Sequence, residues 1–423
     1  MRKILIVGAG QSGLQLALTL LANDYDVTLM SARTAEEIRS GRIMSTQCMF
    51  DANLRIERDH GLNQWEDETV RVEGIGVSIA GPDSSRVMDW VGKLDGYAQS
   101  VDQRVKMAGW LELFEERGGK LIISGVTTAD LNSLAPRYDL TIVSAGKGEL
   151  VGLFDRDPER SPFTSPQRAL SVVYVHGLAP RPEHPDYSAV RFNIVPGAGE
   201  LFMIPAYTVS GNCDILFWEG VPGGPLDCWD DHPGPAEHLS RTLDLMRQFL
   251  PWEYERCANV ELTDAKASLI GGYTPTVRHP IGELPSGAAV LGMADVVVAN
   301  DPITGQGSNN ACKCAQSYLD SILARGDQPF DRQWMRSAFD GYWDYAQHVT
   351  QWTNAMLQPP PPHVMNVLGA ASQIPAVARR FVNGFDDPTD FQNWFMSPDK
   401  ADAYLATFAP PAADEPASSE AVS

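Results

Sequence analysis

A glycine-rich turn near the N-terminus constrains the fold of this chain most. The segment Gly8-Ala9-Gly10-Gln11-Ser12-Gly13 follows an apolar run at residues 3–7 and precedes a helical pattern at residues 14–21. In a strand–turn–helix unit, the first glycine permits a tight turn, the second lets the backbone approach a pyrophosphate, and the third lets the helix pack against the strand. The sequence therefore predicts a Rossmann-like unit whose helix N-terminus binds dinucleotide phosphates, with Gln11 and Ser12 beside them.

The end of the second predicted strand, residues 26–30, departs from this pattern. An acidic residue normally ends that strand and binds the adenosine ribose. Met30, Ser31, Ala32 and Arg33 occupy that place here. We therefore expect looser adenosine binding, with Arg33 as a candidate cofactor contact. The alternative is a glycine turn that only packs and binds no dinucleotide.

Composition excludes several classes of protein. The 423-residue chain has a formal net charge of −21, which argues against binding nucleic acid or an anionic membrane. Its apolar runs are shorter than the roughly 20 residues that span a bilayer. A strand beginning at the N-terminus leaves no room for a signal peptide, so we expect a cytoplasmic protein. The six cysteines do not form a disulfide framework, and Cys312-Lys313-Cys314 is interpreted as buried helix residues rather than a metal site.

The remaining patterns predict an α/β fold with a second domain. Residues 1–165 and 286–330 are expected to form a discontinuous dinucleotide-binding domain, which would include alternating runs at residues 70–90. Short strands separated by turn residues predict an antiparallel substrate domain over residues 166–285. Residues 331–409 are helical and rich in aromatic residues, which we interpret as core packing. Residues 410–423 are expected to be disordered.

A second motif lies near residue 300. Gly292-Met293-Ala294-Asp295 ends a predicted strand, and Pro302-Ile303-Thr304-Gly305-Gln306-Gly307 opens a helix. This arrangement predicts a second helix N-terminus beside the first, which could stabilise negative charge on a reduced flavin. Asp295 would face the ribityl or pyrophosphate region.

The two motifs together resemble those of a known family. Gly8-x-Gly10-x-x-Gly13, Gly292-x-x-Asp295 and Pro302-x-x-Gly305-Gln306-Gly307-x-Asn309 are similar to the FAD-binding signatures of aromatic hydroxylase-type flavoprotein monooxygenases. The resemblance covers about residues 1–325. It implies an FAD-binding domain in which Gly305, Gln306, Gly307 and Asn309 contact the cofactor.

Two departures narrow this resemblance. Single-chain members carry an Asp-Gly segment where this chain has residues 144–149, Ser-Ala-Gly-Lys-Gly-Glu, and the ribose carboxylate is also missing. The chain therefore resembles the oxygenase component of the two-component styrene and indole monooxygenases, the group E flavoprotein monooxygenases. The resemblance implies reduced, diffusible FAD delivered by a separate NADH-dependent flavin reductase. It also implies a homodimer.

That family implies a reaction carried by the cofactor. Addition of O2 to reduced FAD gives a C4a-hydroperoxyflavin, which epoxidises a small aromatic substrate. Indole would give indoxyl and then indigo, styrene would give its epoxide, and sulfoxidation is a further reaction of the same kind. No side-chain nucleophile or metal is required.

The loop at residues 42–49 matches the family's active-site loop. Styrene-type members have asparagine where Ser45 stands, so Ser45, Gln47 and Met49, with Val72 and Ile75, resemble the indole-type pattern. Ala98 is placed at the small residue of a later loop. Ser45 and Gln47 could bind the indole N–H or the flavin edge, or satisfy their own loop backbone.

The remaining candidate residues would contact the flavin ring, the phosphates or the substrate. Pro302 and Thr304 are expected to form the wall above the flavin ring. Arg42 and Arg104 are candidate phosphate or ribityl contacts, or surface arginines that face water. Candidate substrate walls that core packing explains equally well are Val72, Ile75, Phe202, Ile204 and Phe217.

Three rival functions remain. A flavin-dependent halogenase would carry Trp-x-Trp-x-Ile-Pro, of which Leu201-Phe202-Met203-Ile204-Pro205 keeps only the final dipeptide. The lost Asp-Gly segment disfavours a single-chain NAD(P)H hydroxylase. A non-catalytic flavin carrier or sensor would bind FAD and oxidise no substrate.

Overall fold

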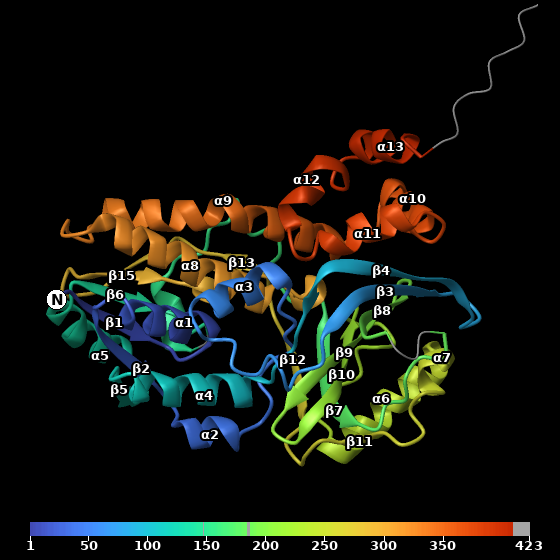
Figure 1. The fold of residues 1–423 in the computed structure, drawn as a ribbon, viewed down its shortest axis with the longest axis horizontal. Helices are drawn as coiled ribbons and strands as arrows, with labels where there is room; N and C mark the ends of the chain where they lie inside the picture. Colours follow the sequence, from blue (N-terminus) through green and yellow to red (C-terminus); the bar gives the residue numbers. More distant parts are fainter. Residues whose placement is uncertain (147, 184–186, 409–423) are drawn as a thin grey trace, which may run out of the picture.

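Two β-sheets lie side by side in the computed structural model, and helices flank both of them (Figure 1). The structure describes residues 1–146, 148–183 and 187–408. The predicted α/β fold is confirmed. The expectation of a disordered tail at residues 410–423 and the Lys147 position of the departing loop lie outside the described residues.

The smaller sheet has six strands in the order β14-β15-β6-β1-β2-β5. Its strands are β1 (Lys3–Val7), β2 (Asp26–Ser31), β5 (Lys120–Ile123), β6 (Leu140–Val143), β14 (Ile281–Glu283) and β15 (Ala289–Gly292). All pairings are parallel except that of β14 with β15. Ile4, Leu5 and Ile6 of β1 are fully buried, as expected for a parallel strand covered on both faces.

Helix α1 (Gln11–Leu21) packs against both α4 (Gln103–Glu116) and α8 (Gly307–Arg325). Three shorter helices belong to the same part of the chain, α2 (Ala35–Arg39), α3 (Asp51–Asp59) and α5 (Thr128–Leu134). The Gln15 side chain of α1 donates to the Cys312 carbonyl of α8 at 3.2 Å. Gln11 and Ser308, in the first turns of the two helices, also line one cavity, so the helices run in the same direction with their N-termini together.

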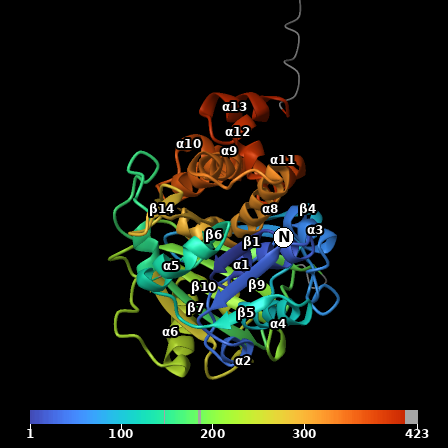
Figure 2. The ribbon, with the colours of Figure 1, turned by 90° about the vertical axis from the view of Figure 1, so that its left-hand side faces the viewer.

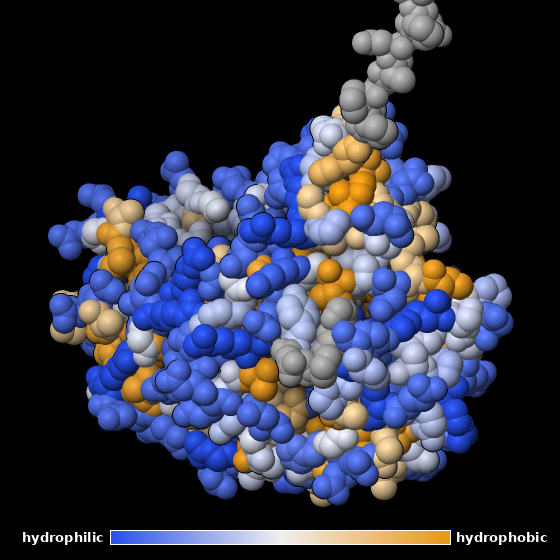
Figure 3. All heavy atoms as spheres, turned by 45° about the vertical axis from the view of Figure 1, so that its right-hand side comes forward, coloured by the Kyte–Doolittle hydropathy of each residue, from blue (hydrophilic) through white to orange (hydrophobic). Residues whose placement is uncertain are grey.

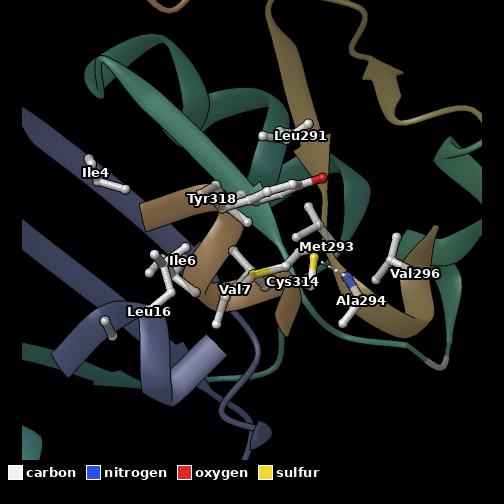
Figure 4. Close-up of a cluster of buried hydrophobic side chains, with 14 of the residues drawn as sticks. Ile4, Ile6, Val7, Leu16, Leu291, Met293, Ala294, Val296, Cys314 and Tyr318 are labelled. Atoms are coloured by element: carbon white, nitrogen blue, oxygen red, sulfur yellow. Dashed lines mark hydrogen bonds between the residues drawn. The ribbon is translucent and has the colours of Figure 1, made fainter. Parts of the chain in front are cut away.

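Helix α8 is fixed by contacts at its cysteine and tyrosine side chains (Figure 4). Tyr318 donates to the Gly292 carbonyl at 2.8 Å, and the Cys314 Sγ accepts from the Ala294 amide at 3.4 Å. Cys312 and Cys314 are both fully buried. The Cys-x-Cys pair is therefore part of the core, as predicted, and Cys314 helps to position the segment that carries Asp295.

The larger sheet has eight strands, in the order β11-β7-β10-β9-β8-β3-β4 with β12 also paired to β7. Its strands are β3 (Val72–Ala80), β4 (Arg86–Ala98), β7 (Ala169–His176), β8 (Ala189–Val195), β9 (Gly199–Thr208), β10 (Gly211–Gly220), β11 (Glu261–Leu262) and β12 (Ser268–Gly272). A separate two-stranded sheet pairs β13 (Thr276–Val277) with β16 (Val298–Ala299).

The position of β3 and β4 corrects the sequence analysis. They were placed with the dinucleotide-binding part, but β3 pairs in parallel with β8, so the larger sheet is not wholly antiparallel. The alternating side chains Ile75, Val77 and Ile79 pack into the core of the larger sheet. The chain therefore crosses to the larger sheet between α3 and β3 and returns with α4.

Helices cover the two faces of the larger sheet. α6 (Pro235–Phe249) and α7 (Pro251–Tyr254) pack on the face that carries Leu216 and Trp218. The C-terminal helices are α9 (Arg332–Met356), α10 (Pro362–Ala371), α11 (Pro375–Asn383), α12 (Phe391–Trp394) and α13 (Pro398–Ala406). α9 follows α8, and α11 packs against β4 (Figures 1 and 2). Trp352, Phe381 and Trp394 are buried there, which confirms the core-packing interpretation.

Most of the surface in Figure 3 is hydrophilic, with scattered apolar areas. The exposed large apolar side chains of the described residues lie on different elements: Met1, Val87, Ile123, Val209, Leu323, Met365 and Phe408. Among the described residues, no helix combines the length and the apolar character that crossing a bilayer requires.

Candidate functional site

The three glycines of the first turn have different surroundings. Gly8 has a φ of +119°, and a Cβ there would lie 2.8 Å from the Ala145 nitrogen. A Cβ on Gly13 would lie 2.1 Å from the Gly8 carbonyl oxygen, whereas a Cβ on Gly10 would meet nothing within 4 Å. Gly8 and Gly13 are therefore required by packing, while Gly10 faces open space that fits a pyrophosphate.

Two helix N-termini without side-chain caps meet at this place. Gly10 precedes α1 and Gln306 precedes α8, and neither provides a side-chain cap. Gly305 adopts a left-handed φ of +64°, and a Cβ on Gly307 would meet nothing within 4 Å. The parallel packing of α1 and α8 therefore presents two sets of free amide N–H groups to one region, which suits an anionic cofactor.

A polar cavity lies between these helix ends and the loop at residues 42–49. It is lined by Gln11, Gln47, Met49, Leu54, Glu57, Asn63, Trp65, Gln99, Val101, Gln103, Lys106 and Ser308. Gln11 and Ser308 belong to the first turns of α1 and α8, so the cavity adjoins both N-termini. Among its lining residues, the sequence analysis predicted only Gln11, Gln47 and Met49.

A buried ion pair forms one side of the polar cavity. Lys106 of α4 contacts Glu57 of α3, and their side chains are 6% and 0% exposed. Gln11 donates to the Glu57 Oε1 at 2.9 Å, so its amide is directed toward this pair. Lys106 also contacts the Met49 sulfur at 3.6 Å. Neither residue belongs to a recognisable motif, so this pair is not predictable from local sequence.

A second, apolar cavity lies on the larger sheet. Its lining residues are Thr46, Gln47, Cys48, Phe50, Ile75, Val190, Phe192, Phe202, Ile204, Phe217, Pro302, Ile303, Thr304, Gly305 and Phe385. Eight of the predicted residues therefore meet here: Gln47, Ile75, Phe202, Ile204, Phe217, Pro302, Thr304 and Gly305. Gln47 lines both cavities and marks the boundary between them.

Several predicted substrate contacts lie elsewhere. Val72 and Ala98 are fully buried and face each other across β3 and β4, outside the lining of either cavity. Met49 lines the polar cavity instead of the apolar one. Phe192, Phe385 and Val190 line the apolar cavity but were not predicted. Phe192 and Val190 reach it because β8 pairs with β3, and Phe385 reaches it because the C-terminal helices pack there.

Polar residues of the loop at residues 42–49 form hydrogen bonds with a buried tyrosine. Ser45 donates to the Gln47 Oε1 at 3.0 Å, and Gln47 donates to the Tyr174 hydroxyl at 3.2 Å. Tyr174 donates in turn to the Ser45 carbonyl at 2.8 Å. Burial raises the pKa of Tyr174 well above its usual value, so its hydroxyl keeps the proton that this bond needs. Tyr174 fixes the loop from β7, and no local signal in the sequence identified it.

Asn309 and Gln306 connect the loop, α8 and the C-terminal helices. The Asn309 amide donates to the Cys48 carbonyl at 2.8 Å and accepts from the Phe50 amide at 3.0 Å. Gln306 donates to the Phe385 carbonyl at 2.9 Å, and the Thr304 and Thr353 hydroxyls are 2.7 Å apart. These contacts support a positioning role for both amides, and their predicted contact with the cofactor stays a prediction.

The candidate arginines differ in their surroundings. The buried Arg104 bonds to the Asp102 carboxylate at 2.8 Å, to Asp264 at 3.0 Å and to the Thr208 hydroxyl at 3.0 Å. Arg42 is exposed, and Arg33 contacts the Met44 sulfur at 2.9 Å. The contacts of Arg104 support a structural role, whereas Arg33 and Arg42 remain candidates for the cofactor.

Asp295 lies in the 3₁₀ turn η3 (Ala294–Val296), where it is exposed. A Cβ on Gly146 would approach the Asp295 Cβ to 3.0 Å, so the end of β6 passes directly beside this aspartate. Within the described parts of the chain, no group of three or more His, Cys, Asp and Glu residues is arranged to hold a metal ion.

Comparison with protein families gives a match over the part of the chain that contains β7 to β10 of the larger sheet. Residues 146–256 match the family described as "Styrene monooxygenase A putative substrate binding domain". Two curated relatives are named styrene monooxygenase StyA. The protein from Pseudomonas fluorescens is 31% identical over 97% of this chain and 99% of its own length, and that from a Pseudomonas species is 30% identical over the same shares.

Solved structures resemble the fold at low identity. A flavoprotein/dehydrogenase from Cytophaga hutchinsonii has a TM-score of 0.65 at 11% identity, and it covers 96% of this chain and 100% of its own. The flavin-dependent brominase Bmp2 has a TM-score of 0.61 at 13% identity, with 96% and 99% covered. The p-nitrophenol 4-monooxygenase PnpA of Pseudomonas putida has a TM-score of 0.62 at 12% identity, with 92% and 99% covered.

Proposed function

Because this chain belongs to the styrene monooxygenase family, we propose that it is an FAD-dependent monooxygenase that epoxidises a small aromatic alkene, with indole as its preferred substrate. The observation that carries this proposal is the arrangement of the two cavities. An apolar cavity adjoins a polar one, the polar one adjoins two free helix N-termini, and Gln47 lines both. The polar cavity measures about 10 Å³, the space of about one water molecule, so the cofactor would lie along the two helix N-termini and the substrate in the apolar cavity beyond Gln47.

The residues that would hold FAD follow from the open space at the glycines. Gly10 and the first turn of α1 would bind the pyrophosphate, because a Cβ-sized space is free there. The α8 N-terminus at Gly307 would face the flavin and stabilise its reduced, anionic form. Arg33, Arg42 and Asp295 are the remaining candidate contacts. Reduced FAD supplies the activation of O2 that lets one oxygen atom be transferred to the substrate double bond.

The chain itself orients the substrate and excludes water. Phe192, Phe202, Phe217 and Phe385 surround the apolar cavity, so an aromatic ring bound there would be shielded from solvent. Pro302 and Thr304 form its wall on the side of α8. The cavity measures about 30 Å³, whereas an engineered cavity of about 150 Å³ binds benzene. Substrate entry therefore requires side chains that line this cavity to move.

The preference for indole rests on Gln47. Its Oε1 accepts one hydrogen bond from Ser45 and has a second lone pair that can accept the indole N–H. Styrene has no such donor. Ser45 would act by orienting the Gln47 amide, since its own hydroxyl is already directed to that oxygen.

We further propose that FAD arrives already reduced from a separate NADH-dependent flavin reductase. The missing ribose carboxylate at Met30 to Arg33 and the missing Asp-Gly segment after β6 support this proposal, because a chain that retained FAD and oxidised NADH itself would need both. A homodimer is expected on the same family resemblance, and the elution volume of the purified protein would test it.

The deciding experiment supplies reduced FAD to the purified chain. We would mix it with FAD, NADH and an unrelated flavin reductase in air, add indole or styrene, and identify the products by chromatography. The proposal expects indigo from indole, a smaller yield of styrene oxide from styrene, and neither product when the reductase is omitted.

Two other outcomes would contradict the proposal. Tight FAD binding without oxidation of either substrate would favour a carrier. A halogenated product, formed from an electron-rich aromatic compound when chloride or bromide is added, would favour a halogenase.

A further inference from the structure

A row of side chains on β9 and β10 extends from the apolar cavity to a group of buried carboxyls. Phe217 and Glu219 lie two residues apart on β10, so their side chains point to the same face of the sheet. Opposite them on β9 lie Phe202 and Glu200, respectively. The two phenylalanines line the apolar cavity. The two glutamates therefore continue the same face beyond it.

Arg168 is the cation that binds within this group of buried carboxyls. Arg168 binds Glu200 with two hydrogen bonds, from Nε to Oε2 at 2.9 Å and from Nη2 to Oε1 at 3.2 Å. Burial raises the pKa of Glu200, and the hydrogen bond and charge of Arg168 oppose this effect. Glu219 lies directly opposite Glu200 and is 0% exposed, and like charges at such opposite positions repel each other. An ionised Glu219 would therefore be a buried charge without a counter-ion of its own.

Asp301 approaches the group from the other side. Its Oδ1 accepts from the Ile303 amide at 3.1 Å and thereby caps the 3₁₀ turn η4 (Pro302–Thr304), which forms the wall of the apolar cavity. The Asp301 carboxyl lies close enough to that of Glu219 for each group to shift the pKa of the other. Among the described residues, no hydrogen-bond donor reaches either oxygen of Glu219 or the Oδ2 of Asp301. Two carboxyl groups can bond each other only when one carries a proton.

We propose that Glu219 keeps a proton and donates it in a hydrogen bond to Asp301, and that this bond positions the Pro302–Thr304 wall for oxygenation. Glu219 is thus a positioning residue for the reaction, and the proposal rests on the proposed function. Loss of the proton would place two carboxylates against each other, and their repulsion would act on Asp301 and on the turn that it caps. The wall would then lose its fixed position at high pH.

The titration of the group agrees with this arrangement. Burial raises the pKa of Glu219 well above its usual value, and Asp301 and Glu200 raise it further while Arg168 opposes them. Burial raises the pKa of Asp301 to about 6, and its bonds from the Ile303 amide and Glu219 act in the opposite direction. The proton therefore belongs to Glu219, with Asp301 as the acceptor.

The first test measures stability and needs neither FAD nor substrate. In the unfolded chain Glu219 releases its proton above about pH 4.3, whereas in the folded chain it keeps this proton to a higher pH. The free energy of unfolding therefore falls as the pH rises from about 4.3 to the folded-state pKa. We would measure Tm between about pH 5 and pH 9 for the wild type and for Glu219→Gln, whose amide donates without a titrating proton. The decrease in Tm is expected to be smaller in the variant. An equal decrease in both proteins would overturn the proposal.

The second test measures the pH profile of kcat/KM for indole, with reductase in excess. The wild type is expected to lose activity at high pH, whereas Glu219→Gln should retain wild-type activity at neutral pH and lose this decline. Glu219→Ala leaves Asp301 without a donor and should lower kcat/KM about tenfold at neutral pH, with little further decline at high pH. Equal activity of the Ala and Gln variants would overturn the proposal.

A matched control lies on the opposite face of the same strand. Burial raises the pKa of Asp214 to about 6, but its side chain points away from the apolar cavity. Asp214→Asn should change the pH dependence of Tm and leave the pH profile of kcat/KM as in the wild type. If the wild type oxidises neither substrate, the proposed function fails, and the Tm comparison still decides whether Glu219 holds the proton.

Discussion

At the scale of single residues, Gln47 determines how the two cavities meet. Its amide lies at their boundary and is held by Ser45 and Tyr174 in one orientation, with Nε2 donating to Tyr174. The oxygen is thereby directed by the protein before any substrate binds. A fixed acceptor loses less conformational entropy on substrate binding than a mobile one. It also discriminates between substrates with and without a hydrogen-bond donor.

Gln47→Met should therefore reduce the preference for indole. Methionine has a similar length and no hydrogen-bond acceptor of comparable strength, so kcat/KM for indole should fall roughly 3–10-fold, the usual value of one neutral hydrogen bond. The value for styrene should change less than about twofold. Competition between the two substrates in one reaction measures the ratio directly, and an unchanged ratio would remove Gln47 from substrate recognition.

Tyr174→Phe should destabilise the loop that carries Gln47. The change leaves the Ser45 carbonyl without its donor, at a cost of about 1–3 kcal/mol in the free energy of unfolding. Tyr342→Phe is the matched control, because this buried hydroxyl has no hydrogen-bond partner among the described residues and its loss should be neutral or slightly stabilising. Urea unfolding at pH 7 compares the two variants. Equal effects would show that the loop does not depend on Tyr174.

At the scale of elements, the β1–α1 turn separates the requirements of the fold from those of the cofactor. Gly13 packs against the Gly8 carbonyl, whereas Gly10 faces open space. Gly13 is therefore needed for the packing of the protein even without a cofactor. Gly10 has a negative φ, so its missing side chain matters only for what binds beside it.

Gly13→Ala should accordingly lower the stability of the protein, whereas Gly10→Ala should weaken FAD binding. Gly13→Ala should cost about 3 kcal/mol or more of unfolding free energy, because its Cβ overlaps backbone atoms. Gly10→Ala should unfold within about 0.5 kcal/mol of the wild type and bind FAD at least tenfold more weakly. Gly369→Ala, in the interior of α10 with nothing near its Cβ, should be slightly stabilising and bind FAD normally. Normal FAD binding by Gly10→Ala would contradict the proposed phosphate site.

The elements also show which structural features can be predicted from the sequence. The turn glycines, the strand–helix order and the second helix N-terminus are encoded by neighbouring residues, and the structure agrees with them. Tyr174, Phe385 and the Lys106–Glu57 pair join elements distant in sequence, so no local pattern identified them. The assignment of β3 and β4 went wrong for a related reason, since alternation predicts a strand but not the sheet in which it pairs.

At the scale of the whole molecule, the two sheets are joined through Arg104. It lies on α4 beside the smaller sheet, and its partners Thr208 and Asp264 belong to the part of the chain that forms the larger sheet. The Arg104 side chain is only 2% exposed, so its ion pairs are shielded from solvent. The cavities lie between elements of both sheets, and a connection that fixes the sheets relative to each other also fixes the distance between the cavities.

Arg104→Met tests this connection against the predicted role of Arg104 as a cofactor contact. The change leaves the Asp102 and Asp264 carboxylates without their cation, and breaking a buried pair in this way costs roughly 3–5 kcal/mol. Arg247→Met, which removes an exposed pair with Asp244, should cost less than about 1 kcal/mol. A loss of FAD affinity at unchanged unfolding free energy would instead support the cofactor contact.

The pH dependence of Asp264→Asn provides an independent measurement. Burial alone would raise the pKa of Asp264, but the hydrogen bond from Arg104 lowers it below its usual value. A carboxyl with a lowered folded-state pKa stabilises the protein above about pH 4 and loses this contribution as the pH falls through the folded-state value. Asp264→Asn should therefore be less stable than the wild type at pH 7, and the difference should decrease on acidification to about pH 3. If the difference stayed constant with pH, the interaction between Arg104 and Asp264 would not be ionic, and the connection between the two sheets would have to rest on packing alone.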